Sequence, residues 1–247
     1  MQRANLLNVL NSLLHPELFK DYAPNGLQVE GKSEIHRIVT AVTATQRVID
    51  EAVRLQADAL LVHHGWFWRG ENPTITATKY KRLKALMDAG INLIAYHLPL
   101  DAHENLGNNA QMAQLLRATD LTQFGEGNFI WMGTVSEIAV GELAAKLGRL
   151  LNRTPLVLGS EQCSVSRLAW CSGAAEDFFE EAIAMGAQAY ISGEATERTT
   201  HLARESGVPF LVCGHHATER LGIKALSDWL EQNHGLECIF VDDDNPI

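Results

Sequence analysis

Apolar residues along this chain fall into short continuous runs separated by stretches with helical periodicity. The runs at residues 37–42, 59–64 and 92–97 have the length and composition of strands that are buried on both faces. Between them, apolar positions recur at the spacing of one helix face, which predicts amphipathic helices. A chain that alternates in this way forms a parallel sheet covered by helices, so the pattern predicts an α/β fold.

The pattern changes near residue 128, where glycines separate shorter apolar segments, and the alternation then resumes. Residues 181–195 of the second half align with 51–65 of the first, and 206–219 aligns with 89–101. These matches are short, and strand–helix–strand units share their patterning, so chance similarity is the alternative explanation. The sequence thus predicts two α/β units related by a weak internal repeat, with sheets covered by helices.

Composition narrows the class of protein without giving a function. Hydrophobic residues make up 46% of the chain and charged residues 20%, which is ordinary for a folded soluble protein. No apolar run approaches the roughly 20 residues of a membrane span, and the net charge of −10 disfavours general binding of nucleic acid. The four cysteines lack C-x-x-C spacing, which favours reduced thiols in a cytoplasmic protein.

Histidines stand at the ends of three predicted strands. His63 and His64 close one run, His97 closes the next, and His215 follows a strand of the second half. Because ligands of open α/β sheets bind beyond the carboxyl ends of the strands, these side chains are candidates for one site. A single histidine in such a place is usually a hydrogen-bonded core or surface residue, but a cluster favours a metal site.

Carboxylates follow two of these histidines at the same spacing. Asp101 is four residues after His97, and Glu219 is four residues after His215. On the first turn of a helix, residues i and i+4 face the same way, so His215 and Glu219 can bind one ion together. Pro99 excludes a regular helix after His97, so we expect Asp101 to reach the site from a loop.

His63 and His64 are adjacent, and strand alternation alone would direct them to opposite faces. A twist at the strand end would let both face a pair of metal ions about 3.5–4 Å apart, with one histidine on each ion. Imidazoles combined with two carboxylates favour Zn²⁺, Fe²⁺, Mn²⁺ or Ni²⁺ over Mg²⁺ and Ca²⁺, which prefer oxygen ligands. We therefore expect two divalent transition-metal ions per subunit.

Other residues near these strand ends have two interpretations each. Glu194 follows the strand that aligns with 59–64, and it is either a general base or a helix cap. His216 adjoins His215 but is three rather than four residues from the acid, so it ranks second as a ligand. The aromatic residues 66–68 either pack in the core or line a pocket and stack on a flat ring.

Four motifs occur in order along the chain: NGLQVEG at 25–31, HHG at 63–65, YHLPLDAHENLGNN at 96–109 and GHHATE at 214–219. Together they resemble the Nif-three-like proteins, a dinuclear-metal family known as GTP cyclohydrolase I type 2 homologues. The resemblance spans nearly the whole chain. His216 stands where the family usually has an aromatic residue, and this chain lacks the long central insertion of some members.

The resemblance implies a two-domain α/β subunit of a hexameric toroid whose paired metal ions face the central cavity. Carried over by position, the metal ligands that it implies are His63, His64, Asp101, His215 and Glu219. Glu219 would be a candidate bridge between the ions. His97 belongs to the same motif, as a ligand or as a partner of one.

The patterns and the candidate ligands together predict three parts of the chain. They are a first α/β unit with metal ligands (1–125), a second α/β unit (126–195), and a C-terminal βα segment that returns metal ligands to the first unit (196–247).

The first functional hypothesis is a dinuclear metal-dependent hydrolase in which the ions activate a water molecule that attacks carbon or phosphorus. His97 or Glu194 would move the proton as catalytic residues. The resemblance adds a small-molecule substrate of nucleotide or purine type, as in opening of the imidazole ring of GTP. The alternative is a ring-shaped metal-binding protein without catalysis that organises partners or nucleic acid, which a metal site closed entirely by protein ligands would favour.

Overall fold

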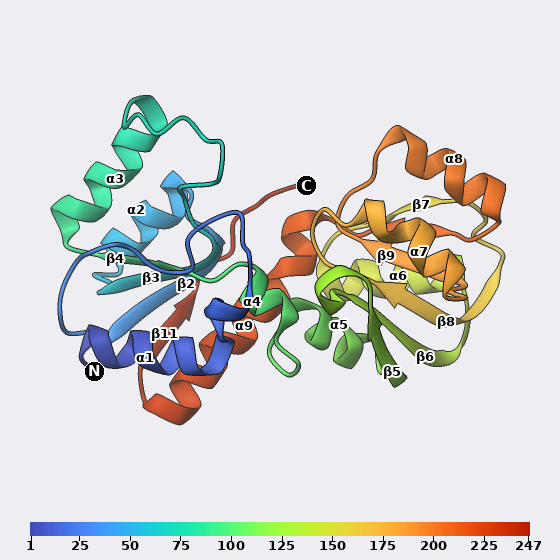
Figure 1. The fold of residues 1–247 in the computed structure, drawn as a ribbon, viewed down its shortest axis with the longest axis horizontal. Helices are drawn as coiled ribbons and strands as arrows, with labels where there is room; N and C mark the ends of the chain where they lie inside the picture. The colour runs from blue at the N-terminus through green and yellow to red at the C-terminus, as the bar shows by residue number, and fades with distance from the viewer. The chain divides into compact units, whose positions relative to one another are not determined.

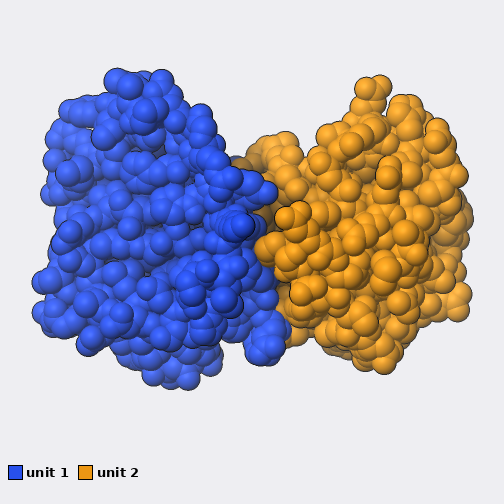
Figure 2. Space-filling view, viewed as in Figure 1, with its two compact units in different colours: residues 1–106, 222–244 blue, residues 107–221, 245–247 orange.

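The computed structural model describes all 247 residues, which divide into two compact units (Figures 1 and 2). Unit 1 comprises Met1–Leu106 and Gly222–Asp244, and unit 2 comprises Gly107–Leu221 and Asn245–Ile247. Each unit contains one mixed sheet with helices on both faces, so the α/β class is confirmed. The boundary after Leu106 differs from the division predicted near residue 125, and the C-terminal segment is shared between the two units.

Unit 1 is built on a five-stranded sheet with the order β1-β4-β3-β2-β11. Its strands are β1 (Gly26–Val29), β2 (Arg37–Thr43), β3 (Ala59–His64), β4 (Asn92–Ala95) and β11 (Glu237–Phe240). Strands β2, β3, β4 and β11 run parallel, and β1 pairs antiparallel with β4. The last strand of the chain therefore returns to the sheet of the first unit.

Helices cover both faces of this sheet (Figure 1). They are α1 (Arg3–Leu14), α2 (Gln46–Arg54), α3 (Ala77–Ala89), α4 (Leu98–Ala102), the 3₁₀ turn η1 (Pro16–Leu18) and the unit 1 part of α9 (His215–His234). Val39 and Leu60 face α2 and α3, whereas their neighbours Ile38 and Leu61 face α1 and α9. Because both faces are buried, the strands are continuous apolar runs.

Unit 2 contains a six-stranded sheet with the order β5-β6-β8-β9-β10-β7. Its strands are β5 (Thr119–Phe124), β6 (Ile130–Ala139), β7 (Leu156–Leu158), β8 (Ser164–Trp170), β9 (Ala189–Ser192) and β10 (Phe210–Val212). Strands β8, β9 and β10 run parallel. The flanking strands β5, β6 and β7 pair antiparallel with their neighbours.

The helices of unit 2 also lie on both faces of its sheet. They are α5 (Asn108–Leu116), α6 (Val140–Leu151), α7 (Phe179–Ala184), α8 (Glu197–Ser206), the first turns of α9, and the 3₁₀ turns η2 (Glu126–Asn128) and η3 (Glu176–Phe178). Trp170 and Ile191 pack with α5 and α6, while Tyr190 and Phe210 pack with α7 and α8. No helix of either unit combines the length and the apolar character that a membrane crossing requires.

Four strands of each sheet follow the same order. The order is β1-β4-β3-β2 in unit 1 and β7-β10-β9-β8 in unit 2, and in both an antiparallel edge strand is followed by three parallel strands. The segments that align in sequence, 51–65 and 181–195, contain β3 and β9, the middle parallel strand of each unit. The common topology supports an internal repeat over chance similarity.

Candidate metal-binding sites

Three histidines of unit 1 converge at the carboxyl ends of β3 and β4. The ring centroids of His63 and His64 are 4.5 Å apart, and those of His63 and His97 are 5.1 Å apart. A donor nitrogen from each of the three rings lies within 4.8 Å of the other two. The adjacent His63 and His64 therefore face the same place, as the predicted twist at the strand end requires.

The rings of His63 and His64 are both held through their Nδ1 atoms. The Nδ1 atom of His63 lies 3.1 Å from the carbonyl oxygen of Tyr96. That of His64 lies 3.3 Å from the hydroxyl oxygen of Thr43, its register partner on β2. A hydrogen bond at one ring nitrogen fixes the orientation of the ring, which leaves Nε2 as the atom offered to a metal.

His97 is held in the same way by Asp21, a residue that the sequence did not indicate. The Nδ1 atom of His97 lies 2.7 Å from Asp21 Oδ1, and the Asp21 side chain is only 3% exposed. Its other oxygen accepts hydrogen bonds from Asn25 Nδ2 and the Leu98 backbone N–H. Burial acts to raise the pKa of Asp21, but the His97 contact and these hydrogen bonds outweigh it and lower the pKa to about 2. A carboxylate behind a histidine is typical of metal centres.

Asp101 approaches the histidines from a short helix rather than from a loop. Helix α4 spans Leu98–Ala102 and has Pro99 in its first turn, where no backbone N–H is needed for the helix. The prediction that Pro99 excludes a helix was therefore wrong. Asp101 is buried, with 8% of its surface exposed, and its Oδ2 atom lies 3.6 Å from His63 Nε2.

In unit 2, His215 and Glu219 lie on the first turns of α9. His215 Nε2 is 3.1 Å from Glu219 Oε2, which confirms the predicted i, i+4 geometry, and Glu219 is 3% exposed. Glu194, which follows β9, lies 2.5 Å from His215 Nδ1. Its alternative interpretation as a helix cap was wrong, because Thr196 caps α8.

The two carboxylates around His215 attract positive charge. Burial acts to lower the pKa of His215, but the hydrogen bond and charge of Glu219, followed by those of Glu194, outweigh it and raise the pKa to about 9. The same attraction favours a cation beside Nε2 in place of a proton, because a metal ion competes with protons for the imidazole lone pair.

Glycines close the three parallel strands of unit 2 and make room for this pair. Gly173, Gly193 and Gly214 follow β8, β9 and β10, and their backbone groups are linked in succession by hydrogen bonds of 2.9 and 3.0 Å. A Cβ atom on Gly173 would lie 2.4 Å from Glu219 Oε1 and 3.3 Å from His215 Nε2. The missing side chain keeps the donor atoms accessible, which fits a bound cation. The sequence pattern did not indicate a role for these glycines, although each one follows a strand.

Core packing is confirmed for one of the three aromatic residues after β3, and the stacking role stays a prediction for the other two. Trp66 packs in the core of unit 1, where its Nε1–H donates to the Ala44 carbonyl oxygen at 3.1 Å. Phe67 is partly exposed, and the Trp68 ring lies 5.0 Å from the ring of His97. His216 in unit 2 is buried, and its backbone N–H donates to the Ile247 carbonyl oxygen.

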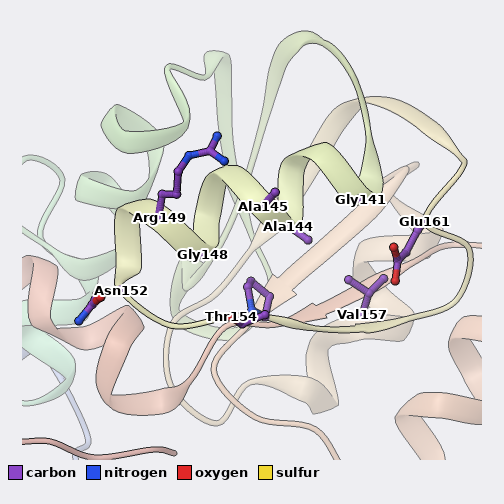
Figure 3. Close-up of a pocket in the computed structure, with 10 residues that line it drawn as sticks. Gly141, Ala144, Ala145, Gly148, Arg149, Asn152, Thr154, Val157 and Glu161 are labelled. Atoms are coloured by element: carbon purple, nitrogen blue, oxygen red, sulfur yellow. The ribbon is translucent and has the colours of Figure 1, made fainter.

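A groove of about 620 Å³ runs along α6 in unit 2 (Figure 3). Helix α6 contributes four small residues and Arg149 to its lining, and Val157 lies across from the small residues Gly141, Ala144, Ala145 and Gly148. Small side chains on a helix face leave space unfilled beside it. None of the predicted ligands lines this groove, so it is separate from the His215–Glu219 pair.

The donor sets of both units suit transition-metal ions. Imidazole nitrogens and carboxylate oxygens occur together in each unit, and each of the four histidines has its Nδ1 atom within reach of another group. These His, Asp and Glu clusters are consistent with a metal site. That the ligands of the two units share one pair of ions stays a prediction.

Known proteins resemble the chain over its full length. Residues 1–246 match the model of the family described as Duf34/NIF3 (NGG1p interacting factor 3). A Vibrio cholerae protein named GTP cyclohydrolase 1 type 2 homolog is 48% identical over 252 residues, which cover 100% of both chains.

Two solved structures have the same fold over the whole chain. The structure of protein ybgI, described as of unknown function, has 47% identity and a TM-score of 0.95 over 100% of both chains. That of TTHA1606 from Thermus thermophilus has 33% identity and a TM-score of 0.89, again over 100% of both chains.

Proposed function

Because the chain belongs to the Duf34/NIF3 family, we propose that it is a dinuclear metal-dependent hydrolase that acts on a nucleotide or purine-like substrate. The observation that carries the proposal is the set of four histidines at strand ends, each held through Nδ1, with buried carboxylates beside them. The substrate class follows from relatives that bear the name GTP cyclohydrolase 1 type 2 homolog.

The proposed ligands are His63, His64 and Asp101 in unit 1, together with His215 and Glu219 in unit 2. Their nitrogen and oxygen donors favour Zn²⁺, Fe²⁺, Mn²⁺ or Ni²⁺, and we propose two ions per chain. When bound, such ions supply Lewis acidity, which activates water as a nucleophile and stabilises developing negative charge.

His97 is the proposed proton carrier of the reaction. Its Nδ1 atom lies 2.7 Å from Asp21 Oδ1, and this carboxylate, whose lowered pKa keeps it charged, orients the ring with Nε2 free to face the site. Nε2 is the atom of His97 that accepts and returns the proton. Glu194 holds Nδ1 of His215 at 2.5 Å, a contact that supports a role in positioning this ligand over a role in proton transfer.

The test replaces ligands one at a time, as Asp101→Asn and Glu219→Gln, and measures metal content and turnover on the same samples. Mass spectrometry gives the ions per chain, and the substrate panel includes GTP, GMP and phosphoesters, each with added Zn²⁺, Mn²⁺, Fe²⁺ or Ni²⁺. We expect turnover to require metal and both variants to lose metal and activity. His201→Ala, which removes an exposed histidine of α8, is the matched control.

Two outcomes would contradict the proposal. A variant that has lost its metal but turns over substrate at the normal rate would exclude a metal-dependent reaction. A protein that holds two ions and acts on no member of the panel would favour the metal-binding alternative without catalysis. The hexamer that the resemblance implies stays a prediction, and a native mass six times that of one chain would support it.

A further inference from the structure

Two aromatic side chains and an arginine stand beside the histidines of unit 1, outside the residues that the proposed reaction uses. The Trp68 ring lies 5.0 Å from that of His97 and 5.8 Å from that of His64. The Tyr22 ring lies 6.5 Å from His97, and the guanidinium carbon of Arg69 lies 5.6 Å from the centre of the Tyr22 ring. Tyr22 is 58% exposed and Trp68 is half-buried, so both rings have surface available to a ligand.

The backbone that presents Trp68 is anchored on one side and strained. The Trp66 backbone N–H donates to Gln28 Oε1 at 2.7 Å, and its indole is fixed in the core. The next residue, Phe67, has φ +67, a left-handed conformation that is strained for a bulky residue. This turn takes the chain from the core-bound Trp66 to Trp68 beside the histidines. Strain of this kind persists where the surrounding structure enforces it, often at ligand-binding sites.

Arg69 connects the same loop to the segment that holds His97. Its backbone N–H donates to the Tyr22 carbonyl oxygen at 2.7 Å, and its Nη2 donates to the Asp21 carbonyl oxygen at 2.7 Å. These contacts hold the guanidinium over the Tyr22 ring in a cation–π arrangement. Arg69 is exposed, and a guanidinium has five N–H donors, so it can bind an anion while it keeps these contacts.

We propose that Tyr22, Trp68 and Arg69 form a recognition wall that binds a planar heteroaromatic ring carrying a phosphate group. The aromatic side chains would contact the ring and Arg69 would pair with the phosphate, which brings the substrate against the histidines. The inference rests on the proposed function and deepens it, because it names the side chains that select the substrate of that site.

Three probes separate the contributions of ring and phosphate: GMP has both, guanosine has only the ring, and ribose 5-phosphate has only the phosphate. Calorimetric titration measures their binding to the full-length protein, as purified with metal and again after chelation. We expect GMP to bind most tightly in both states, since the wall itself contains no proposed metal ligand.

Variants then assign the preference to particular side chains. Trp68→Ala should weaken binding of GMP and guanosine about tenfold, as expected for loss of one stacking contact, while Trp68→Phe should retain most of the affinity. Arg69→Met should weaken GMP about tenfold and leave guanosine unchanged. Tyr80→Ala is the control, because Tyr80 is a 51% exposed aromatic residue on α3 of the same unit.

Each result bears on one of the two proposals. If ribose 5-phosphate binds as well as GMP, or if Trp68→Ala binds GMP like the parent protein, the recognition wall is refuted even where metal content and turnover are normal. If the protein holds no metal but GMP binding still depends on Trp68, the wall is supported and the metal-dependent hydrolase fails. Circular dichroism of each variant verifies that a loss of binding is not a loss of fold.

Discussion

Replacement of Asp21 by asparagine tests the proposed role of His97 at a single atom. In the structure, Asp21 Oδ1 lies 2.7 Å from His97 Nδ1 and accepts from the Tyr22 N–H, while Oδ2 accepts from Asn25 Nδ2 and the Leu98 N–H. An asparagine has one acceptor end and one donor end. Whichever way the amide is turned, its NH₂ group would face groups that donate hydrogen bonds.

The size of the effect follows from the contact that is lost. A hydrogen bond to a charged partner contributes about 1.5–3 kcal/mol, and 1.4 kcal/mol corresponds to a factor of ten. The ratio of the neutral His97 tautomer with its proton on Nδ1 to the tautomer with its proton on Nε2 should therefore fall by about 10–100-fold in Asp21→Asn. Turnover should fall by a similar factor, since residues behind a reacting or ligating histidine typically contribute this much.

Nitrogen-15 NMR of the imidazole rings measures the tautomer directly and needs neither metal nor substrate, and turnover is measured in parallel. Asp50→Asn is the matched control, because Asp50 is an exposed carboxylate whose side chain accepts from Gln46. An unchanged His97 spectrum together with unchanged turnover would refute the reasoning. Loss of metal with the tautomer change would instead make His97 a ligand.

Three further predictions concern metal binding and stability. Gly173→Ala should release metal from the His215–Glu219 pair and lower the free energy of unfolding by about 1–2 kcal/mol. The reason is that the new methyl group would lie 2.4 Å from Glu219 Oε1, at a residue with φ +69. Metal analysis and urea denaturation measure the two effects, and the absence of both would contradict the prediction. Burial acts to raise the pKa of Asp58, but the hydrogen bond from Lys32 and two backbone N–H groups outweigh it and lower the pKa below 3.8. The stabilisation is then present above pH 3.8 and is lost as the pH falls through the folded-state pKa, so Asp58→Asn should lower the free energy of unfolding by about 1–3 kcal/mol at pH 7. Urea denaturation at a series of acidic pH values should show a shrinking difference in this free energy between the parent protein and the variant. A difference that stays constant with pH would contradict the prediction. Chelation should lower the melting temperature and added Mn²⁺ or Zn²⁺ should restore it, because an ion present at 100 times its Kd stabilises the folded state by about 2.7 kcal/mol; scanning calorimetry with and without chelator measures the shift.

The sequence predicted the strands that are buried on both faces, because only those strands are continuous apolar runs. It located β2, β3 and β4 of unit 1 and β9 and β10 of unit 2. It also placed the histidines correctly at strand ends, since parallel strands share one carboxyl edge. Strand β5 was not predicted, because nearly all of its residues are exposed and it has no buried face to mark it.

Other features depend on contacts between distant parts of the chain. Strand β11 pairs with β2 in unit 1, a choice that no local pattern determines. Asp21 lies ahead of β1, 76 residues from the His97 that it holds, so only the folded chain brings the two together. The expectation that Asp101 lies on a loop was wrong because a proline prevents a helix in later turns but not in the first.

The left-handed backbone of Phe67 links two properties of the protein, its stability to heat and its selectivity for ligands. A change that improves the first should weaken the second. Glycine adopts such a φ without steric cost, so a selection for heat-stable variants should favour Phe67→Gly early. That exchange would also make the orientation of the Trp68 side chain less fixed. The more heat-stable variant would then bind its ligands less selectively. A stabilised form intended for screening should therefore keep phenylalanine at this position.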